Sequence, residues 1–335
     1  MLLDLSDRAK LNVTGADRVR FLNGQLTNDI VSLQPGSAIY ACALTAKGKL
    51  CADLFVGATK ESLSLDAEAV LRESLTARLE KYIIADDVML EDVTEAFGLF
   101  HLIDVESEEC VGGTEDRVGV GAYRRGSVGE LVEFEQPPEG VGVEELDLPS
   151  EVVRIVCNRF GVPGMDLWFP ADQTAVVMER LQQSPIDPEA AENLRIAQGI
   201  ARWGSELSED VIPTEAGLDQ RAINFFKGCY LGQEVISRIK SVGHVNRHLR
   251  GFRPACGVVL GIGDKLFADE ESTKEIGFIT SIGQERLLKR TIALGYARRG
   301  FDTPGSTLQV RRNNTLIGAI EVCSLPFDGK TEEKK

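Results

Sequence analysis

Residues 39–56 read IYACALTAKGKLCADLFV, and this stretch decides the fold of the first part of the chain. Two runs of β-forming residues, 39–44 and 50–56, flank a polar turn in which Gly48 is free to adopt a positive φ. That pattern predicts a β-hairpin. A hairpin here favours antiparallel or mixed sheets over the parallel sheet of a dinucleotide-binding fold.

The segments around the hairpin predict an α+β region that extends to about residue 240. Leu71, Leu75 and Leu79 recur at helical spacing within 68–83 and form one apolar face. Further strands are predicted at 10–14, 88–93, 99–105 and 152–157. Further helices are predicted from Ala16, over 171–183 and over roughly 188–198.

Residues 106–150 give a weaker pattern because they are charged and rich in glycine. We expect irregular strands and loops there. The helix over 171–183 follows them, and its spacing is expected to turn Val176, Val177 and Leu181 inward.

From about residue 245 the pattern changes to short apolar runs separated by turns that contain glycine. These runs predict a small antiparallel barrel or sandwich. Residues 284–288 could form a short helix, and the charged residues 328–335 are expected to be a disordered tail. The apolar runs are Leu249–Phe252, Val258–Leu260, Ile276–Ile282, Thr291–Tyr296, Thr307–Val310 and Thr315–Val322.

The chain has 335 residues, 43% of them hydrophobic, and a formal net charge of −15. Its length predicts two or three compact units. Its negative charge repels phosphate backbones and anionic lipids, so direct nucleic-acid or membrane binding is not expected. Seven cysteines without a C-x-x-C pair argue against a disulfide framework and a cysteine-rich zinc site.

The amino end reads MLLDLSDR, which lacks the cationic region and apolar core of a signal peptide. No window approaches the roughly 18 apolar residues of a membrane-spanning helix. With the cysteine pattern, this favours a soluble protein in the reducing cytoplasm.

Residues 226–238, FKGCYLGQEVISR, place Cys229 in a setting that suits reactivity. Lys227 offers a cation that stabilises a thiolate, and a helix that starts after Gly232 adds partial positive charge at its amino end. Gly228 lets the backbone bend freely. The alternative is a buried cysteine that acts as a small hydrophobic residue beside an ordinary turn.

Gln233, Glu234 and Arg238 could form a polar cluster beside this thiol. Glu234 and Arg238 are i, i+4 partners if residues 232–240 are helical. The alternative is a surface ion pair worth about 0.3–0.5 kcal/mol.

In the first part of the chain, Asn28, Asp29 and Asp53 could hydrogen-bond the amine edge of a heterocycle. Turn formation also explains Asn28 and Asp29. Asp53 interrupts an apolar run, and the alternative is that it lies on the solvent face of an alternating strand.

Several other chemical motifs do not occur. No G-x-G-x-x-G follows a strand, and no G-x-x-x-x-G-K-[ST] is present. His244 and His248 lack the carboxylate of an H-E-x-x-H motif, and no G-x-S-x-G occurs. We therefore expect no metal site and no hydrolase triad.

Residues 227–234, KGCYLGQE, resemble the signature of the YgfZ-type folate-binding proteins, which are relatives of the glycine cleavage T-protein (aminomethyltransferase). The resemblance continues in the same order over nearly the whole chain. The other segments are VTGAD at 13–17, FLNGQLTNDI at 21–30, LTAKGK at 44–49 with Asp53 and Leu54, YIIADDV at 82–88, LRI at 194–196 with Gly199 and Ile200, IG at 276–277 and ALGY at 293–296.

The resemblance implies a cloverleaf-like α+β fold. Two α+β subdomains within residues 1–244, whether or not their segments interleave, would surround a central tetrahydrofolate cavity. An antiparallel β-barrel at 245–327 would follow, with the tail at 328–335. The resemblance also implies an accessory factor for maturation or repair of iron–sulfur proteins, with folate and iron–sulfur client or assembly proteins as partners. Its link to tRNA modification would be indirect.

The resemblance also assigns roles to residues. Cys229 would be the reactive thiol, tuned by Lys227. The residues that would shape the site are Gly228, Tyr230, Gly232, Gln233, Glu234 and Arg238. The residues that would contact the folate are Asp53, Asn28 and Gln198.

The chain departs from the family pattern at two positions. T-proteins carry paired aspartates where this chain has Ala52 and Asp53, which weakens the expectation of aminomethyl transfer. The acidic residue of the 194–200 segment is replaced by Ala197, followed by Gln198, which puts the usual pterin contact in question. Two alternatives therefore stay open: a tetrahydrofolate-dependent aminomethyltransferase, and a non-catalytic interaction scaffold.

Overall fold

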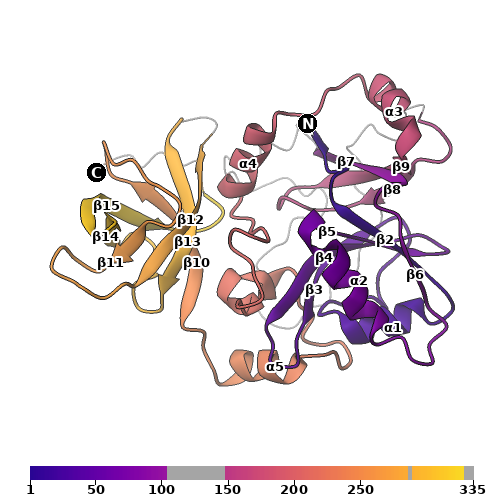
Figure 1. The fold of residues 1–335 in the computed structure, drawn as a ribbon, viewed down its shortest axis with the longest axis horizontal. Coiled ribbons are helices and arrows are strands. Elements are labelled where there is room, and N and C mark those ends of the chain that lie inside the picture. Colours follow the sequence, from indigo (N-terminus) through magenta and orange to yellow (C-terminus); the bar gives the residue numbers. More distant parts are fainter. Residues whose placement is uncertain (104–147, 286–288, 328–335) are drawn as a thin grey trace, which may run out of the picture.

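A computed structural model describes residues 1–103, 148–285 and 289–327. These residues form two β-sheets and a closed barrel, with helices around them (Figure 1). Most of the irregular region expected at 106–150, the end of the possible helix at 284–288 and the charged tail lie outside the described residues.

The first sheet is built on the predicted hairpin. Its five antiparallel strands run in the order β3-β4-β5-β2-β6. Their bounds are β2 (Ala9–Thr14), β3 (Ala38–Leu44), β4 (Leu50–Ala58), β5 (Leu63–Ala67) and β6 (Met89–Asp92). Gly48 has a φ of +74° in the turn between β3 and β4, which confirms the hairpin and the need for glycine there.

Helices α1 (Arg18–Gln25) and α2 (Arg72–Glu80) pack on one face of this sheet. Leu22 of α1 and Leu75 of α2 share a buried core with Leu54 of β4. The apolar spacing predicted within 68–83 is thus confirmed, although the first turn, Ala69–Leu71, is a 3-10 helix. Because strand side chains alternate, the opposite face of β3 and β4 is left for other contacts.

The second sheet has the order β1-β7-β9-β8. Its strands are β1 (Leu2–Asp4), β7 (Phe97–Ile103), β8 (Val153–Val156) and β9 (Gly164–Pro170). Helix α3 (Thr174–Leu181) packs against it through Val177 and Leu181. The inward orientation predicted for Val176 is wrong: its side chain is 44% exposed, because it lies about 100° around the helix from Val177.

The carboxyl part forms a closed barrel in the order β10-β13-β12-β11-β14-β15. Its strands are β10 (Arg247–Pro254), β11 (Lys265–Phe267), β12 (Gly277–Gln284), β13 (Thr291–Arg298), β14 (Thr307–Arg312) and β15 (Thr315–Cys323). The predicted small β-domain is therefore confirmed as a barrel. The strand predicted at Val258–Leu260 is wrong: this run is a loop in which Val258 and Leu260 pack on the barrel core and Val259 is exposed.

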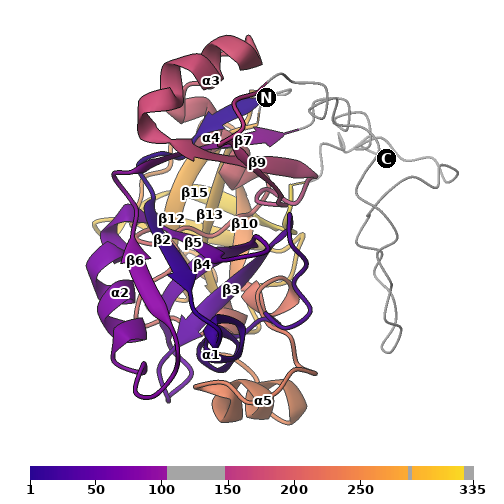
Figure 2. The same cartoon turned by 90° about the vertical axis from the view of Figure 1, so that its right-hand side faces the viewer.

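Two further helices lie between the sheets and the barrel in the sequence, α4 (Pro188–Ala197) and α5 (Gln233–Ser241). Figure 1 shows α4 beside the barrel, and there the Asn193 side chain accepts a hydrogen bond from the Gln284 backbone at 2.7 Å. Figure 2 shows α3 and α5 at opposite ends of the molecule. No helix in the described ranges is both long and apolar enough to cross a membrane.

A buried carboxylate, Glu206, joins the barrel to α4. It accepts hydrogen bonds from Thr280 at 2.7 Å and Ser281 at 2.6 Å, and it forms an ion pair with Arg195 of α4 at 2.9 Å. The Tyr296 hydroxyl donates to the Glu206 backbone oxygen at 2.9 Å. The barrel is therefore positioned by charged and hydroxyl groups removed from water.

Glu206→Gln is expected to destabilise the protein by about 3 kcal/mol, because it leaves the buried Arg195 with one carboxylate partner fewer. The matched control Glu234→Gln breaks an exposed pair and should cost less than about 1 kcal/mol. Urea unfolding followed by tryptophan fluorescence measures both. Equal shifts of the two midpoints would contradict the role given to Glu206.

Candidate functional site

The face of the first sheet that points away from α1 and α2 is polar near its centre. Phe55 of β4 lies directly opposite Tyr40 of β3 on one side and Asp66 of β5 on the other. Asp53 lies opposite Cys42 in the same way. The alternation of strand side chains therefore places all five residues on one face.

Asp53 is the centre of this face and is only 6% exposed. The Tyr40 hydroxyl donates to its Oδ2 atom at 2.8 Å, whereas its Oδ1 atom has no hydrogen-bond partner. Burial raises the pKa of the Asp53 carboxyl to about 6, in spite of the Tyr40 hydrogen bond. The solvent-face alternative for Asp53 is therefore wrong, and the carboxyl can gain or lose a proton near neutral pH.

Tyr230, from the loop before α5, supplies a second unsatisfied group. Its hydroxyl is buried without a hydrogen-bond partner, and burial raises its pKa to about 12, with the nearby Cys42 thiol as a further cause. The pKa of the Cys42 thiol is itself raised well above its usual value by burial and by Asp53. Cys42 thus lies within electrostatic reach of both Asp53 and Tyr230. Two buried polar atoms without partners are typical of a site that a ligand completes.

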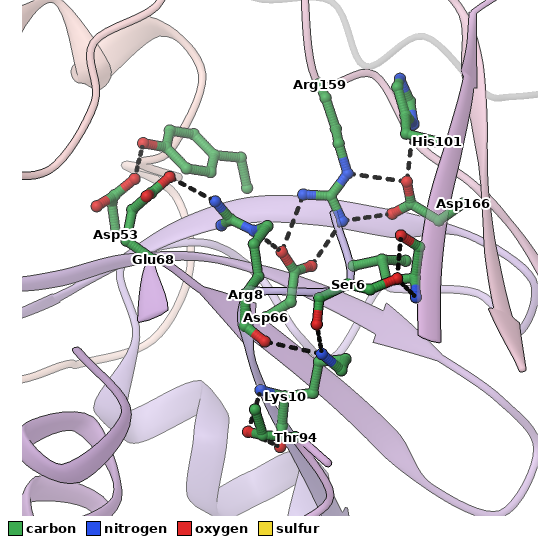
Figure 3. A network of polar contacts seen from close by, with 12 residues as sticks. Ser6, Arg8, Lys10, Asp53, Asp66, Glu68, Thr94, His101, Arg159 and Asp166 are labelled. Carbon is green, nitrogen blue, oxygen red and sulfur yellow. Dashed lines mark hydrogen bonds and ion pairs between the residues drawn. The ribbon is translucent and has the colours of Figure 1, made fainter. Parts of the chain in front are cut away.

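A buried ionic network adjoins this carboxyl (Figure 3). The Arg159 guanidinium donates to Asp66 at 3.0 and 2.6 Å and to Asp166 at 2.8 and 2.7 Å. Arg8 then links Asp66 to Glu68, with both ion pairs at 2.6 Å. Figure 3 shows Asp53 next to Glu68, at the end of the network.

Cys229 is exposed, so the alternative of a buried, inert cysteine is wrong. The Nζ atom of Lys227 donates to three backbone oxygens, those of Asn23 at 2.7 Å, Leu26 at 2.8 Å and Asn28. These bonds use all three donors of the ammonium group. Burial lowers the pKa of Lys227 to about 8. Lys227 therefore tethers the loop to α1 and the segment that follows it. Its role in tuning the thiol stays a prediction.

The residues on either side of Cys229 contribute backbone geometry more than chemistry. Gly232 has a φ of +89°, and a side chain there would meet the Thr45 carbonyl oxygen, so glycine is required. At Gly228 a side chain would meet no atom within 4 Å. Gln233 is partly exposed at the first position of α5, and its backbone nitrogen donates to the Tyr230 backbone oxygen.

Glu234 and Arg238 do form the expected i, i+4 ion pair, at 2.8 Å. Their side chains are 85% and 69% exposed. The surface-pair alternative is therefore confirmed, and the structure does not bring these two residues into the cluster of Asp53, Tyr40 and Tyr230.

Asn28 has a bridging role. Its side-chain nitrogen donates to the backbone oxygens of Tyr40 at 2.8 Å and Arg221 at 3.3 Å. Asp29 accepts from the Val31 nitrogen in a local turn, as the alternative for this pair proposed. Gln198 ends α4 and its amide oxygen lies near Gly161.

Two hollows on the described residues, of about 260 and 240 Å³, lie away from this cluster. One is formed by α4 with β12, and the other by the outside of the barrel near Phe301. Neither is lined by Asp53 or Cys229, so neither locates the central cavity that the family resemblance implies.

Comparison with known proteins assigns two regions of the chain to domain families. Residues 1–120 match the model of the GCVT N-terminal domain, and residues 247–328 match the glycine cleavage T-protein C-terminal barrel domain. The chain therefore carries both domains of the glycine cleavage T-protein, over these two regions. The expected resemblance is thus confirmed at the level of the superfamily.

Individual relatives of this chain are distant in sequence but similar over their length. The aminomethyltransferase of Thermosipho melanesiensis is 23% identical and aligns over 100% of this chain and 87% of its own length. A putative chloroplastic transferase of Arabidopsis thaliana is 27% identical and aligns over 92% of this chain and 68% of its own length. The crystal structure of aminomethyltransferase T from Bartonella henselae has a TM-score of 0.75 at 21% identity, over 97% of this chain and 85% of that one, which shows the shared fold.

Asp53→Asn is expected to raise stability at pH 7 by about 2–3 kcal/mol. The folded-state pKa of Asp53, about 6, lies above the unfolded value of 3.8, so the wild-type carboxyl stabilises the fold only while it is protonated. This contribution is fully present below pH 4 and is lost as the pH rises through 6. Urea unfolding of both proteins from pH 4 to pH 8 measures the difference; a difference independent of pH would contradict the assignment.

Proposed function

We propose that this chain binds a reduced folate at the polar face around Asp53 and transfers a one-carbon unit from an aminomethylated carrier to tetrahydrofolate. The observation that carries the proposal is the buried Asp53 carboxyl, which has one oxygen held by Tyr40 and the other unpaired. Support comes from the relatives, several of which are named aminomethyltransferases and align over most of this chain.

The residues present fit such a ligand. The free Oδ1 atom of Asp53 can accept a hydrogen bond from an N–H group, and the Tyr230 hydroxyl can donate or accept one. Both atoms are buried, so a heterocycle with amine and carbonyl groups would satisfy them without competition from water. Bound tetrahydrofolate would supply the nitrogen atoms that receive the one-carbon unit.

The chain's own residues then divide the work. Asp53 can take up or release a proton at Oδ1, because its pKa of about 6 lies close to physiological pH. Tyr40 keeps Oδ2 in place, so that Oδ1 remains the atom that faces the ligand. The surrounding apolar core, which includes Leu44 and Leu50, limits the access of water.

Ala52 does not weigh against this proposal. Its side chain is fully buried in the aliphatic core shared with α1 and α2, on the face of β4 opposite to Asp53. A second aspartate at this position would point away from Asp53 by the alternation of the strand. Of the two positions that are aspartates in T-proteins, the chain therefore keeps the one that lies on the polar face.

Tetrahydrofolate binding measured by isothermal titration calorimetry is the direct test. Asp53→Ala should weaken binding about 10- to 100-fold, because it removes a charged hydrogen-bond acceptor worth about 1.5–3 kcal/mol. Tyr230→Phe removes a neutral group and should weaken binding by up to about tenfold. Glu234→Gln, which alters an exposed side chain, is the control and should leave affinity unchanged. Wild-type protein that shows no binding at millimolar folate would refute the proposal and favour the scaffold alternative.

Turnover separates binding from catalysis. With an aminomethyl-lipoyl carrier protein and tetrahydrofolate, the wild type should form methylene-tetrahydrofolate and release ammonia. Asp53→Asn should lower kcat by about 100-fold or more, since it removes the proton acceptor. Folate binding without turnover would refute the transferase activity and leave the second candidate below.

The second candidate is a YgfZ-type folate-binding accessory factor for iron–sulfur proteins. Cys229 favours it, because this thiol is exposed on a loop that Lys227 fixes to the end of α1. A reactive thiol at this place would be accessible to a client protein. This candidate shares the folate site with the first and differs in the use of the cysteine.

Complementation distinguishes the two candidates. In a strain that lacks its own YgfZ-type protein, Cys229→Ala should abolish rescue if the accessory role holds. Cys256→Ala, which removes another exposed thiol on the barrel, is the matched control and should rescue fully. Full rescue by Cys229→Ala would exclude a role for this thiol.

A further inference from the structure

The hydroxyl that holds Asp53 is itself fixed by a stack of rings. Tyr40 and Phe55 face each other across β3 and β4, with ring centroids 4.8 Å apart and an angle of 35° between the planes. Such cross-strand aromatic pairs restrict each other's rotamers. The position of the Tyr40 hydroxyl therefore depends on where the ring of Phe55 lies.

The ring of Phe55 also contacts a rigidly held arginine. The Arg159 guanidinium carbon lies 4.2 Å from the ring centroid. Four hydrogen bonds to Asp66 and Asp166 leave this guanidinium without rotational freedom. Arg159 is only 4% exposed, so its contact with the ring is not diluted by solvent.

A second arginine, Arg221, lies near the Tyr40 ring. The Arg221 guanidinium carbon lies 5.9 Å from the Tyr40 ring centroid. Its Nη2 atom donates to the backbone oxygens of Asn158 and Arg159 at 3.1 Å each. The segment that carries Arg159 is thus attached to both aromatic rings.

We propose that Arg159 is a positioning residue for Asp53, acting through Phe55 and Tyr40. The carboxylates of two sheets fix the guanidinium, the guanidinium fixes the Phe55 ring, and the paired Tyr40 ring presents its hydroxyl to Oδ2. The catalytic meaning of this stack rests on the proposed function, in which Asp53 is the reacting carboxyl. The contacts from Arg159 through Phe55 and Tyr40 to Asp53 do not depend on the proposed function.

Other charged or titratable groups also face Asp53, and the stack must be distinguished from them. Cys42 lies opposite it on β3, Glu68 directly follows β5, and Arg8 directly precedes β2. Glu68 and Arg8 form an ion pair with each other, so their effects on Asp53 oppose one another. The direct hydrogen-bond donor to Asp53 is Tyr40.

The test is the titration of Asp53 itself, in the full chain and without folate. Aspartate labelled with ¹³C at the carboxyl carbon reports each pKa by NMR, and the Asp53→Asn spectrum identifies the Asp53 signal. Phe55→Leu removes the ring that contacts both Arg159 and Tyr40, and it keeps an apolar side chain. Its Asp53 signal should titrate at a higher pH than in wild type, because a displaced hydroxyl no longer stabilises the carboxylate.

Three further variants complete the comparison. Tyr40→Phe removes the hydroxyl and should therefore give the largest upward shift of the Asp53 pKa. The double variant Tyr40→Phe/Phe55→Leu should titrate at the same pH as Tyr40→Phe. Arg159→Lys keeps the charge but loses the planar contact and the paired hydrogen bonds, and should shift the titration in the same direction.

Phe100→Leu is the matched control for a lost ring. It breaks another buried aromatic pair, Phe100 with Phe169 at 4.8 Å, in the second sheet. Its melting temperature should fall about as far as that of Phe55→Leu, with the Asp53 titration unchanged.

Three results would overturn the proposal. They are an unchanged Asp53 titration in folded Phe55→Leu, a shift of the same size in Phe100→Leu, and a downward shift in Phe55→Leu, which would mean that water entering a cavity dominates. Because none of these measurements uses folate, they stand even if the chain proves not to bind one. Calorimetry on the same variants then tests the functional consequence: Phe55→Leu should weaken tetrahydrofolate binding severalfold, and Phe100→Leu should not.

Discussion

The structure depends most on one buried guanidinium, that of Arg159. It lies between Asp66 of the first sheet and Asp166 of the second, and its bonds to them are buried charged contacts between the two sheets. Burial alone would raise the pKa of Asp166, but Arg159 holds it well below its usual range. Three charged groups removed from water are costly unless each is paired, so this arrangement admits little variation in how the sheets meet. His101 adds a further hydrogen bond to Asp166 at 2.8 Å.

The candidate site is a product of the same interface. Alternation along β3 and β4 gives one aliphatic face, covered by α1 and α2, and one polar face. The polar face is closed by Arg159 from the second sheet and by Tyr230 from the loop before α5. Enclosure by these segments keeps the Asp53 carboxyl buried, and this burial raises its pKa to about 6.

Much of the fold follows from the sequence, because the hairpin and the α2 helix have strong periodic patterns. The strands that the sequence analysis missed are Leu2–Asp4, Leu63–Ala67, Gly164–Pro170 and Lys265–Phe267. Two of them are three residues long, and Asp66 and Asp166 interrupt the other two. The sequence predicts a site role for Asp53, because this residue interrupts an apolar run. It predicts no such role for the neighbours Tyr40 and Cys42. They are ordinary strand residues until the register places them opposite Phe55 and Asp53. The roles of Lys227 and Arg159 depend on contacts between distant segments, which no local pattern reveals.

The three hydrogen bonds of Lys227 have a consequence for how the protein is made. They join the loop of Cys229 to backbone oxygens about 200 residues earlier in the chain. A ribosome delivers residues 23–28 long before residue 227, and amino-terminal segments generally fold first. The docking surface for the ammonium group is then ready when the loop emerges. The loop of Cys229 therefore docks late in folding, and only on a chain whose amino-terminal part has already folded.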